Sequence, residues 1–298
     1  MRKTKILFLM IFLISFIFVA TSCTGGLLLF IDVEKGDTYR IDMNQKTIID
    51  MSMEGETITV DQENEFVYLV DIKDVDEDGN VTAEYKFDSM KISMETPAGN
   101  ISFDSNTADE NEPILKLVGS SYTAKMTKHG EIIEITGLND MMDSIIDPND
   151  PNTEIFKDSF SEESIKEMMG QSTIIYPDEK IEPGYTWEEN ISMDSMFSMD
   201  INTVYTLNEI EDGTASISMD AEFSADMSEM MEKLGLEAQG KLEGTMTGDT
   251  EVNVRNSFIS NGTIKMDLSG TIDSSFQGTT FSMPMDITNE TTFSTTKQ

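Results

Sequence analysis

A two-residue alternation of apolar and polar side chains runs through most of this chain and limits what it can fold into. Residues 81–87 read Val-Thr-Ala-Glu-Tyr-Lys-Phe, residues 214–219 read Thr-Ala-Ser-Ile-Ser-Met, and residues 263–268 read Thr-Ile-Lys-Met-Asp-Leu. Segments 47–53 and 90–94 continue the pattern. Because successive side chains of a strand point to opposite faces, the pattern predicts antiparallel strands with one apolar and one solvated face.

Glycine-containing dipeptides separate the alternating runs. Asp78-Gly79, His129-Gly130, Asp212-Gly213 and Asn261-Gly262 are typical of tight turns. Asp, Asn and Gly accept the positive φ that such turns require, so these dipeptides predict hairpins between neighbouring strands. His129 is the only histidine, and its place before Gly130 predicts an exposed turn residue.

Two stretches with helical spacing interrupt the strands. The first lies within 138–170, where Ser161 offers an N-cap and Gly170 is expected to end the helix. The second covers about 224–235, with Ser224 as its cap and Gly235 as its end. Both are amphipathic and would lay an apolar stripe against the sheet. The sequence therefore predicts a mainly β fold with a few helices (α+β).

The first residues of the chain have the plan of a bacterial signal peptide. Arg2, Lys3 and Lys5 precede an apolar run over 6–20, and small residues stand just before Cys23, the only cysteine. Small residues followed by cysteine resemble the lipobox of bacterial lipoproteins. The resemblance implies that Cys23 becomes the first mature residue and carries acyl chains that anchor the protein to a membrane. A second apolar stretch, 27–31, leaves an uncleaved signal anchor as the alternative.

This anchor predicts a place in the cell envelope. Thr24 rather than Asp follows Cys23, which by the same resemblance favours the outer membrane of a Gram-negative cell. In a cell with one membrane it favours the outer leaflet of the plasma membrane. A lipid-modified Cys23 leaves no thiol for disulfides, so stability must come from packing.

The chain is strongly acidic. It holds 20 Lys and Arg against 56 Asp and Glu, a formal net charge of −36. Removal of residues 1–22 takes away three cations and no acid, so 17 cations would remain against 56 acids, or −39. Such a charge repels nucleic acid and anionic headgroups, which excludes nucleic-acid binding. Contact with the membrane is therefore expected through the acyl anchor alone.

The chain divides near its midpoint, and its two sides are similar. Gly36-Asp37-Thr38-Tyr39 opens the first, and Gly184-Tyr185-Thr186-Trp187 opens the second. These markers indicate a weak duplication, with one continuous sheet and two separate domains both open as outcomes. The expected segments are a signal peptide (1–22), a lipid-anchored tether (23–30), a first β-rich half (31–146), a loop with an amphipathic helix (147–172) and a second β-rich half (173–298).

Four short motifs resemble an uncharacterised family of secreted bacterial lipoproteins. They are Lys-Gly-Asp-Thr-Tyr at 35–39, the Asp-Gly hairpin and following strand at 78–89, Gly-Ser-Ser-Tyr-Thr at 119–123, and Pro-Gly-Tyr-Thr-Trp at 183–187. The family brings no activity with it. Its expected shape resembles the half-barrel of lipoprotein carriers, a curved antiparallel sheet with helices over the concave side; this analogy concerns architecture and not function.

Asp74, Asp76 and Asp78, followed by Gly79, imitate the start of a calcium loop. Such a loop needs a bidentate acid at its twelfth position, which here is Tyr85. The string also stands directly before an alternating strand. An ordinary hairpin turn and a weak calcium site are thus the two interpretations, and the first is favoured.

The chain is rich in methionine, with 23 residues. Methionine occupies the positions that Ile, Leu and Phe hold in neighbouring strands, which favours core packing. The alternatives are a pliable cavity for an apolar ligand and a copper site, and copper lacks supporting ligands here. Trp187 is expected to anchor the sheet to a helix or to line the cavity. The cavity would be lined by Met51, Met53, Met168, Met227, Met230, Met231 and Trp187.

Catalytic motifs are missing from the sequence. A single histidine, His129, gives no Ser-His-Asp set, and no nucleophile elbow, zinc-helix motif or phosphate loop is present. We therefore expect no catalysis, no metal and no cofactor. The leading hypothesis is a lipoprotein that binds an apolar or amphiphilic ligand. The alternative is a structural or adhesive surface module that binds a protein or a glycan.

Overall fold

A computed structural model describes residues 26–298 except 54, 111, 146–160, 194–197, 234–237 and 277–278. Its strands are β1 (Thr38–Met53), β2 (Glu56–Val75), β3 (Val81–Thr96), β4 (Gly99–Asp104), β5 (Ser121–Met126), β6 (Ile132–Thr136), β7 (Thr186–Met193), β8 (Ser198–Glu211), β9 (Thr214–Asp226), β10 (Ala238–Asn253), β11 (Ile259–Phe276) and β12 (Thr279–Lys297). Its helices are the 3-10 helix η1 (Pro113–Leu117) and the α-helices α2 (Leu138–Ile145), α4 (Glu162–Ser172) and α5 (Ser228–Lys233). Among the described residues, none of these helices has the length and apolar character of a membrane-spanning segment.

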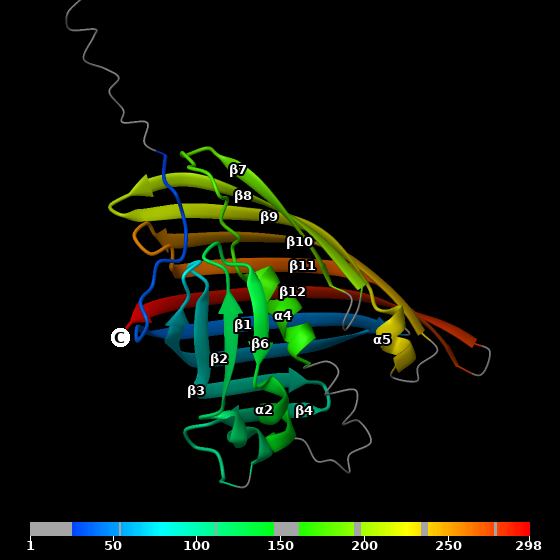
Figure 1. The fold of residues 1–298 in the computed structure, drawn as a ribbon. Coiled ribbons are helices and arrows are strands. Elements are labelled where there is room, and N and C mark those ends of the chain that lie inside the picture. Colours follow the sequence, from blue (N-terminus) through cyan, green and yellow to red (C-terminus); the bar gives the residue numbers. More distant parts are fainter. Residues whose placement is uncertain are drawn as a thin grey trace, which may run out of the picture.

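All the strands belong to one antiparallel sheet of 12 strands. Their order is β6-β5-β3-β2-β1-β12-β11-β10-β9-β8-β7, and β4 pairs with β3 off this path. The two ends of the chain meet in the middle, where residues 39–51 of β1 pair with residues 285–297 of β12. The two halves anticipated from the sequence therefore share a single continuous sheet (Figure 1).

The alternation assigns each strand an apolar and a polar face, as predicted. One row across the sheet places Ile201, Phe223, Gly244, Leu268, Ile287 and Ile49 opposite one another on the same face. The next row, on the other face, contains Asn202, Glu222, Thr245, Asp267, Thr288 and Ile48. The apolar rows face the helices and the polar rows face solvent.

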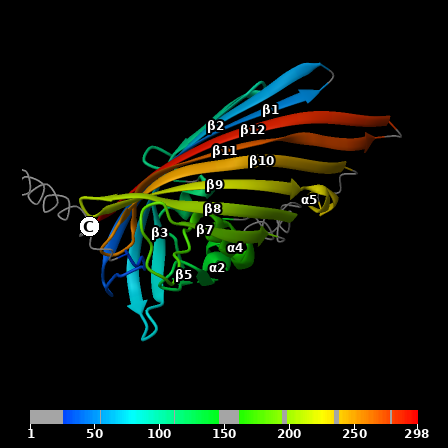
Figure 2. The same cartoon turned by 90° about the horizontal axis from the view of Figure 1, so that it is seen from above.

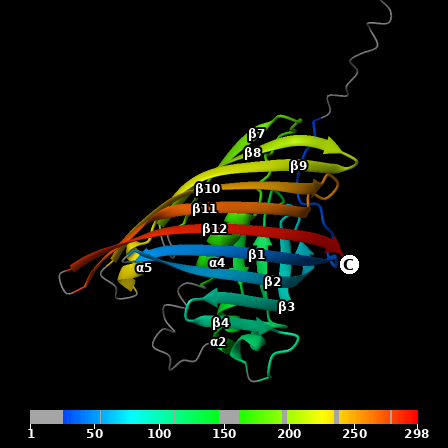
Figure 3. The same cartoon turned by 180° about the vertical axis from the view of Figure 1, so that it is seen from behind.

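The sheet is strongly curved, and α2 and α4 lie on its concave side (Figure 2). Seen from behind, the convex side shows the strands of the sheet with no helix in front of them (Figure 3). Helix α4 contacts both β6 and β7, the two ends of the strand order, and so bridges the edges of the open sheet. A mainly β fold with one curved antiparallel sheet is thus confirmed, and its shape fits the predicted half-barrel.

One end of the concave side is filled by a core. The segments around Leu29 and Ile181 lie across it and pair with each other, with the Leu27 N–H donating to the Ile181 carbonyl at 2.8 Å. Trp187 stacks on Tyr205 with ring centroids 5.3 Å apart and donates its indole N–H to the Ile175 carbonyl at 2.8 Å. A second cluster under α2 and α4 is centred on Val70, Val81, Ala124, Ile135 and Leu138.

The helix ends differ in part from the prediction. Ser161 caps α4 as expected, since its hydroxyl accepts the Ser164 N–H at 3.2 Å. The prediction that Gly170 ends this helix is wrong, because α4 continues to Ser172 and an interior glycine costs only about 1 kcal/mol.

The second helix begins later than predicted, at Ser228. Ser224 does not cap it but lies inside β9, where it pairs with Asp200 and Glu243. The Asp226 carboxylate accepts the Ser228 N–H at 2.9 Å and begins α5 instead. Gly235, the predicted end, lies outside the described residues.

Three of the predicted turn dipeptides are turns, and one is not. Gly79, Gly130 and Gly213 all have positive φ, as the prediction requires. Asn261-Gly262 instead lies within β11, and the chain reverses near Ser257, which has a φ of 48°. Gly262 packs against Phe293 on the neighbouring strand, so its missing side chain serves packing and not a turn.

Glycines on the concave face allow β10 and β11 to approach closely. A Cβ atom at Gly270 would meet the Lys241 carbonyl oxygen, and one at Gly244 would meet the Asp267 carbonyl oxygen, both closer than the 3.0 Å that Cβ atoms respect. Glycine within a strand is typical of a sharp bend or a close backbone contact. These two positions therefore permit the curvature at the middle of the second half.

The hairpin between β2 and β3 is organised by one carboxylate. The Asp76 carboxylate accepts the Asp78 N–H at 3.1 Å, the Asn80 N–H at 2.8 Å and the Asn80 amide at 3.0 Å, and it pairs with Lys125 at 3.1 Å. The Asn80 side chain first, then its N–H and Lys125, lower the pKa of Asp76 from 3.8 to about 2. These donors all come from the turn and a neighbouring strand, as an ordinary hairpin requires.

We predict that Gly270→Ala destabilises the protein by about 2 kcal/mol or more, because the added methyl group has no space beside the Lys241 carbonyl. Gly170→Ala is the matched control. It lies in α4 with nothing within 4 Å of the new Cβ and should stabilise the protein by about 0.5–1 kcal/mol. Urea unfolding followed by circular dichroism measures both, and equal free energies for the two variants would contradict the packing argument.

We also predict that Asp76→Asn reduces the loss of unfolding free energy that the protein undergoes as the pH falls. Since the folded-state pKa lies below the unfolded value, the Asp76 carboxylate stabilises the fold above about pH 4 and loses this effect as the pH falls toward 2. The unfolding free energy of the wild type should therefore fall more between these limits than that of Asp76→Asn. Asp78→Asn makes the same charge change in the same turn and should follow the wild type.

Candidate functional site

The concave face is only partly covered at the end where α5 lies. Its apolar side chains there are partly exposed, in contrast to the buried clusters at the other end. We call this surface the open floor; it consists of Ile49, Met51, Ile58, Val60, Leu268 and Ile287. The strand register places these residues in two adjacent rows. An apolar surface of this kind, left partly exposed, is typical of a binding site.

Several of the methionines predicted to line a cavity meet at this floor. Met231 of α5 packs against Met285 and Ile272, and Met51 and Met227 join the same cluster. Met53, Met168 and Met230 belong to β1, α4 and α5, but their side chains lie outside what the structure describes. Trp187 is placed apart from this group, in the packed core beside Tyr205.

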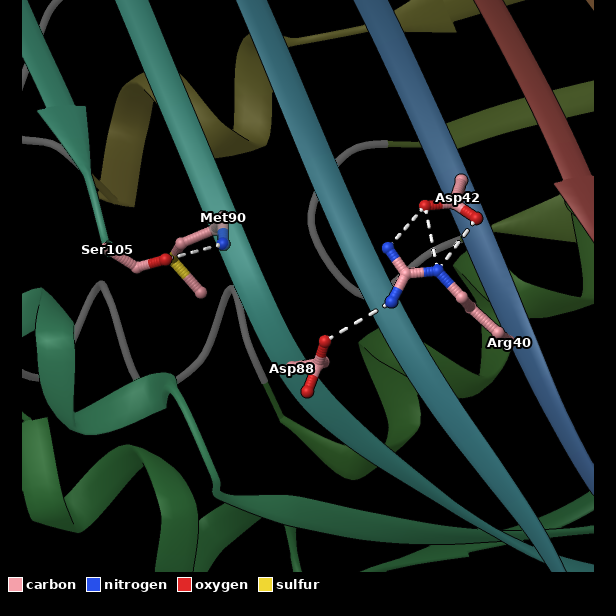
Figure 4. A network of polar contacts seen from close by, with 5 residues as sticks. All are labelled: Arg40, Asp42, Asp88, Met90 and Ser105. Atoms are coloured by element: carbon pink, nitrogen blue, oxygen red, sulfur yellow. Dashed lines mark hydrogen bonds and ion pairs between the residues drawn. The ribbon is translucent and has the colours of Figure 1, made fainter. Parts of the chain in front are cut away.

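Charge is segregated between the two faces of the sheet. From the row of Met43 to the row of Met51, the concave-facing residues of β1, β2 and β10–β12 are uncharged. On the convex face of the same strands Lys46 pairs with Glu63 at 2.9 Å. Nearby, Arg40 holds Asp42 at 2.8 Å and reaches Asp88 at 3.4 Å (Figure 4). The open floor is thus an uncharged surface in a highly acidic protein.

A band of neutral polar side chains interrupts the apolar rows at the inner edge of the open floor. We call it the polar ladder; it consists of Gln45, Thr47, Gln62, Asn64, Asn289 and Thr291. It forms two adjacent rows, Asn289-Thr47-Gln62 and Thr291-Gln45-Asn64. Sequence reasoning missed it, since these residues come from three strands, one of them the distant β12, and only the register brings them together.

Hydrogen bonds link the members of the polar ladder. Gln62 Nε2 donates to Asn64 Oδ1 at 3.1 Å, and Asn64 Nδ2 donates to Gln45 Oε1 at 3.1 Å. Asn289 Nδ2 donates to Thr47 Oγ1 at 2.8 Å, and Asn289 Oδ1 accepts from Thr291 Oγ1 at 3.0 Å. Asn64 is only 6% exposed, while the other members are partly exposed. The ladder is therefore held in place while it retains access to the concave side.

One carboxylate does face the concave side, at the edge strand β7. Glu189 lies two residues after Trp187 and opposite Thr203, which is buried. Burial raises the pKa of the Glu189 carboxyl, and the charge of Glu131 raises it further. Glu131 directly precedes β6, the strand at the other end of the sheet order, which α4 bridges to β7.

The remaining sequence candidates do not converge on a metal. Asp74 pairs with Lys35 at 3.2 Å, and Asp76 is engaged in the turn described above. In the part of the chain that the structure describes, no group of three or more His, Cys, Asp or Glu side chains is placed to hold a metal ion.

The lone histidine differs from its prediction. His129 is not an exposed turn residue, since its side chain is 19% exposed and its Nε2 lies 2.9 Å from Asp178. The segment before β7 lies beside it, with the Tyr176 N–H donating to the His129 carbonyl at 2.8 Å. Cys23 and the preceding signal sequence lie outside the described residues.

Several solved structures resemble this chain distantly. Lipovitellin is 10% identical with a TM-score of 0.46, over 89% of this chain and 25% of that chain, so this protein spans about a quarter of it. The translocator domain of the autotransporter NalP from Neisseria meningitidis is 7% identical with a TM-score of 0.22, over 88% of this chain and 90% of that chain. An outer membrane channel from Pseudomonas putida F1 is 5% identical with a TM-score of 0.27, over 90% and 98%. At these scores the likenesses carry no argument about function.

Sequence comparison identifies the family. No curated protein matches this sequence. A family model described as "Family of unknown function (DUF6263)" matches residues 78–259, from the turn after β2 to the first residue of β11. The match covers more than half of the chain and crosses both halves of the sheet. It confirms the expected membership of an uncharacterised family, while the lipoprotein character stays a prediction. The chain belongs to the DUF6263 family, whose function is unknown.

Proposed function

We propose that this protein is a lipid-anchored envelope protein that holds an apolar or amphiphilic ligand against the concave face of its sheet, without catalysis. The observation that carries the proposal is the open floor, an uncharged and partly exposed apolar surface in a chain with a net charge of −36. Apolar surface gains about 25 cal/mol for each Å² removed from water. A ligand that covers the floor would therefore be held mainly by the hydrophobic effect.

The cluster around α5 supports the same proposal. Met231 and Met227 project from the region of this helix onto the floor beside Met51. Methionine is flexible and polarizable, so it adapts to ligands of varied shape. We infer that α5, a helix of only one to two turns, forms the adjustable cover of the ligand at this end.

The anchor would attach to the opposite end of the molecule. Gly26, the first described residue, lies against Lys180, next to the pairing of Leu27 with Ile181 at the packed end of the sheet. Figure 1 shows the first described residues (dark blue) at this end of the sheet, while α5 lies at the other. A lipid on Cys23 would then place the open floor away from the membrane surface.

The convex face favours a second candidate function, a surface module that binds a protein or a glycan. This face carries exposed Ser, Thr and acidic residues with no cover, such as Asp286, Thr288 and Glu290 on β12. Polar rows of this kind suit hydrogen bonding to a hydroxyl-rich partner. It remains the alternative because it leaves the open floor without a role.

We predict that Met51→Glu lowers the affinity for co-purified lipid at least tenfold, because a carboxylate on the floor would lose its hydration when the ligand binds. Native mass spectrometry of the processed full chain measures the lipid adducts. Ser52→Glu is the matched control, since it adds the same charge on the next residue of β1 but on the convex face. Loss of adducts in both variants, or in neither, would count against the floor as the binding surface.

We predict that Cys23→Ser abolishes lipidation. In the wild type, the N-terminal peptide of the purified protein should begin at Cys23 and carry the added mass of acyl chains. In the variant this mass should be absent, and the cell membrane fraction should lose the processed form. A wild-type protein that keeps residues 1–22 without added acyl mass would instead support the signal anchor.

A further inference from the structure

The polar ladder interrupts a face of the sheet that is otherwise apolar. Apolar rows flank it on both sides, with Met43, Phe66 and Phe293 in the row toward the packed core and Ile49, Val60 and Ile287 in the row of the floor. Polar side chains at such a position cost free energy unless they are hydrogen-bonded. A run of Val, Ile and Met would continue the face without this cost. The polar side chains therefore point to a function beyond packing.

The ladder also retains hydrogen-bonding capacity. Among the described residues, Gln62 Oε1 and Gln45 Nε2 have no hydrogen-bond partner, and neither is a fully buried atom. A carbonyl oxygen that accepts and an amide nitrogen that donates thus stand on neighbouring strands, joined through Asn64. A headgroup with hydroxyls, each of which can donate and accept, offers a partner to each of the two atoms.

The surroundings favour an uncharged ligand. The concave-facing rows on either side of the ladder hold no charged residue that could compensate an ionised headgroup. Burial of an unpaired charge costs several kcal/mol. The net charge of −36 further disfavours a carboxylate or a phosphate.

The distance from the ladder to α5 suits a single apolar chain. From Thr47 to Met51 is four residues of β1, or about 13 Å of strand, and the floor continues to the cluster under Met231. One end of a ligand would therefore meet neutral amides and hydroxyls, and the rest would meet only apolar side chains.

Building on the proposed function, we propose that the polar ladder binds the hydroxyl-bearing, uncharged headgroup of a neutral single-chain amphiphile, the class to which monoacylglycerols belong. Gln62 accepts from a ligand hydroxyl and Gln45 donates to a ligand oxygen. The acyl chain lies along the open floor toward α5.

The test is a titration by native mass spectrometry of the processed full chain, released from non-ionic detergent. The probes share one chain length: 1-monooleoylglycerol, oleate, oleylamine and the hydrocarbon 1-octadecene. We expect monooleoylglycerol to bind at least tenfold more tightly than oleate or oleylamine. Gln62→Met should weaken monooleoylglycerol about tenfold, the loss expected for one to two hydrogen bonds, and leave octadecene unchanged.

Two further variants make the test decisive. Gln239→Met is the matched control, because Gln239 is an exposed glutamine on the other face of the sheet, on β10, and its loss should change nothing. Gln45→Met should reproduce the effect of Gln62→Met. If Gln62→Met fails to fold, Gln45→Met is measured in its place. Retained octadecene binding shows that a variant is folded.

The outcomes separate this proposal from the proposed function. Equal binding of monooleoylglycerol and oleate, or unchanged monooleoylglycerol binding in both ladder variants, would overturn the role of the ladder while ligand binding stands. Tighter binding of oleylamine would point to Glu189 in place of the ladder. If none of the four probes binds the wild type, the proposed function itself fails.

Discussion

The pairing of β1 with β12 is the contact on which the rest of the structure depends. These strands lie more than two hundred residues apart in the sequence, yet they pair over residues 39–51 and 285–297. Without this seam, the chain would form two separate meanders, each with a long unpaired edge that invites association with other chains. With it, the two meanders become one curved sheet. The ladder and the open floor both cross the seam, so the candidate site exists only when the terminal strands have met.

Curvature and charge segregation follow from the same alternation. From the row of Met43 to the row of Met51, β1, β2 and β10–β12 send their acidic side chains to the convex face, where repulsion between carboxylates is relieved by solvent and by pairs such as Lys46 with Glu63. The small concave-facing residues Gly244 and Gly270 let the strands approach and bend. A bent sheet brings its edges near enough for α4 to bridge β6 and β7. The packed end is thereby closed, and the uncharged floor is left at the other end.

Local signals in the sequence predicted the strands, most turns and the cap of α4, because these depend on residues close together in the chain. Ser161 caps α4, and Gly79 takes a positive φ in the turn between β2 and β3, as their local chemistry requires. The same rules failed where tertiary packing decides. Gly262 fits beneath Phe293 within a strand, and Ser224 is held in β9 by two neighbouring strands. In each case the pairing of a long strand outweighed a preference worth about 1 kcal/mol.

The polar ladder could not be predicted in this way, because no local window contains it. Gln45, Gln62 and Asn289 each read as an ordinary polar residue, and a shift of one residue in any strand would turn its side chain to the convex face. The hydrogen bonds across the seam, such as Asn289 to Thr47, reward the observed register and penalise its neighbours. The polar ladder thus divides two roles between different atoms: the Asn289–Thr47 bond helps to fix the register across the seam, while Gln62 Oε1 and Gln45 Nε2 stay open to a ligand. Because the ladder spans β12, β1 and β2, its two rows are complete only when the terminal strands have paired, so the seam and the site form in one step.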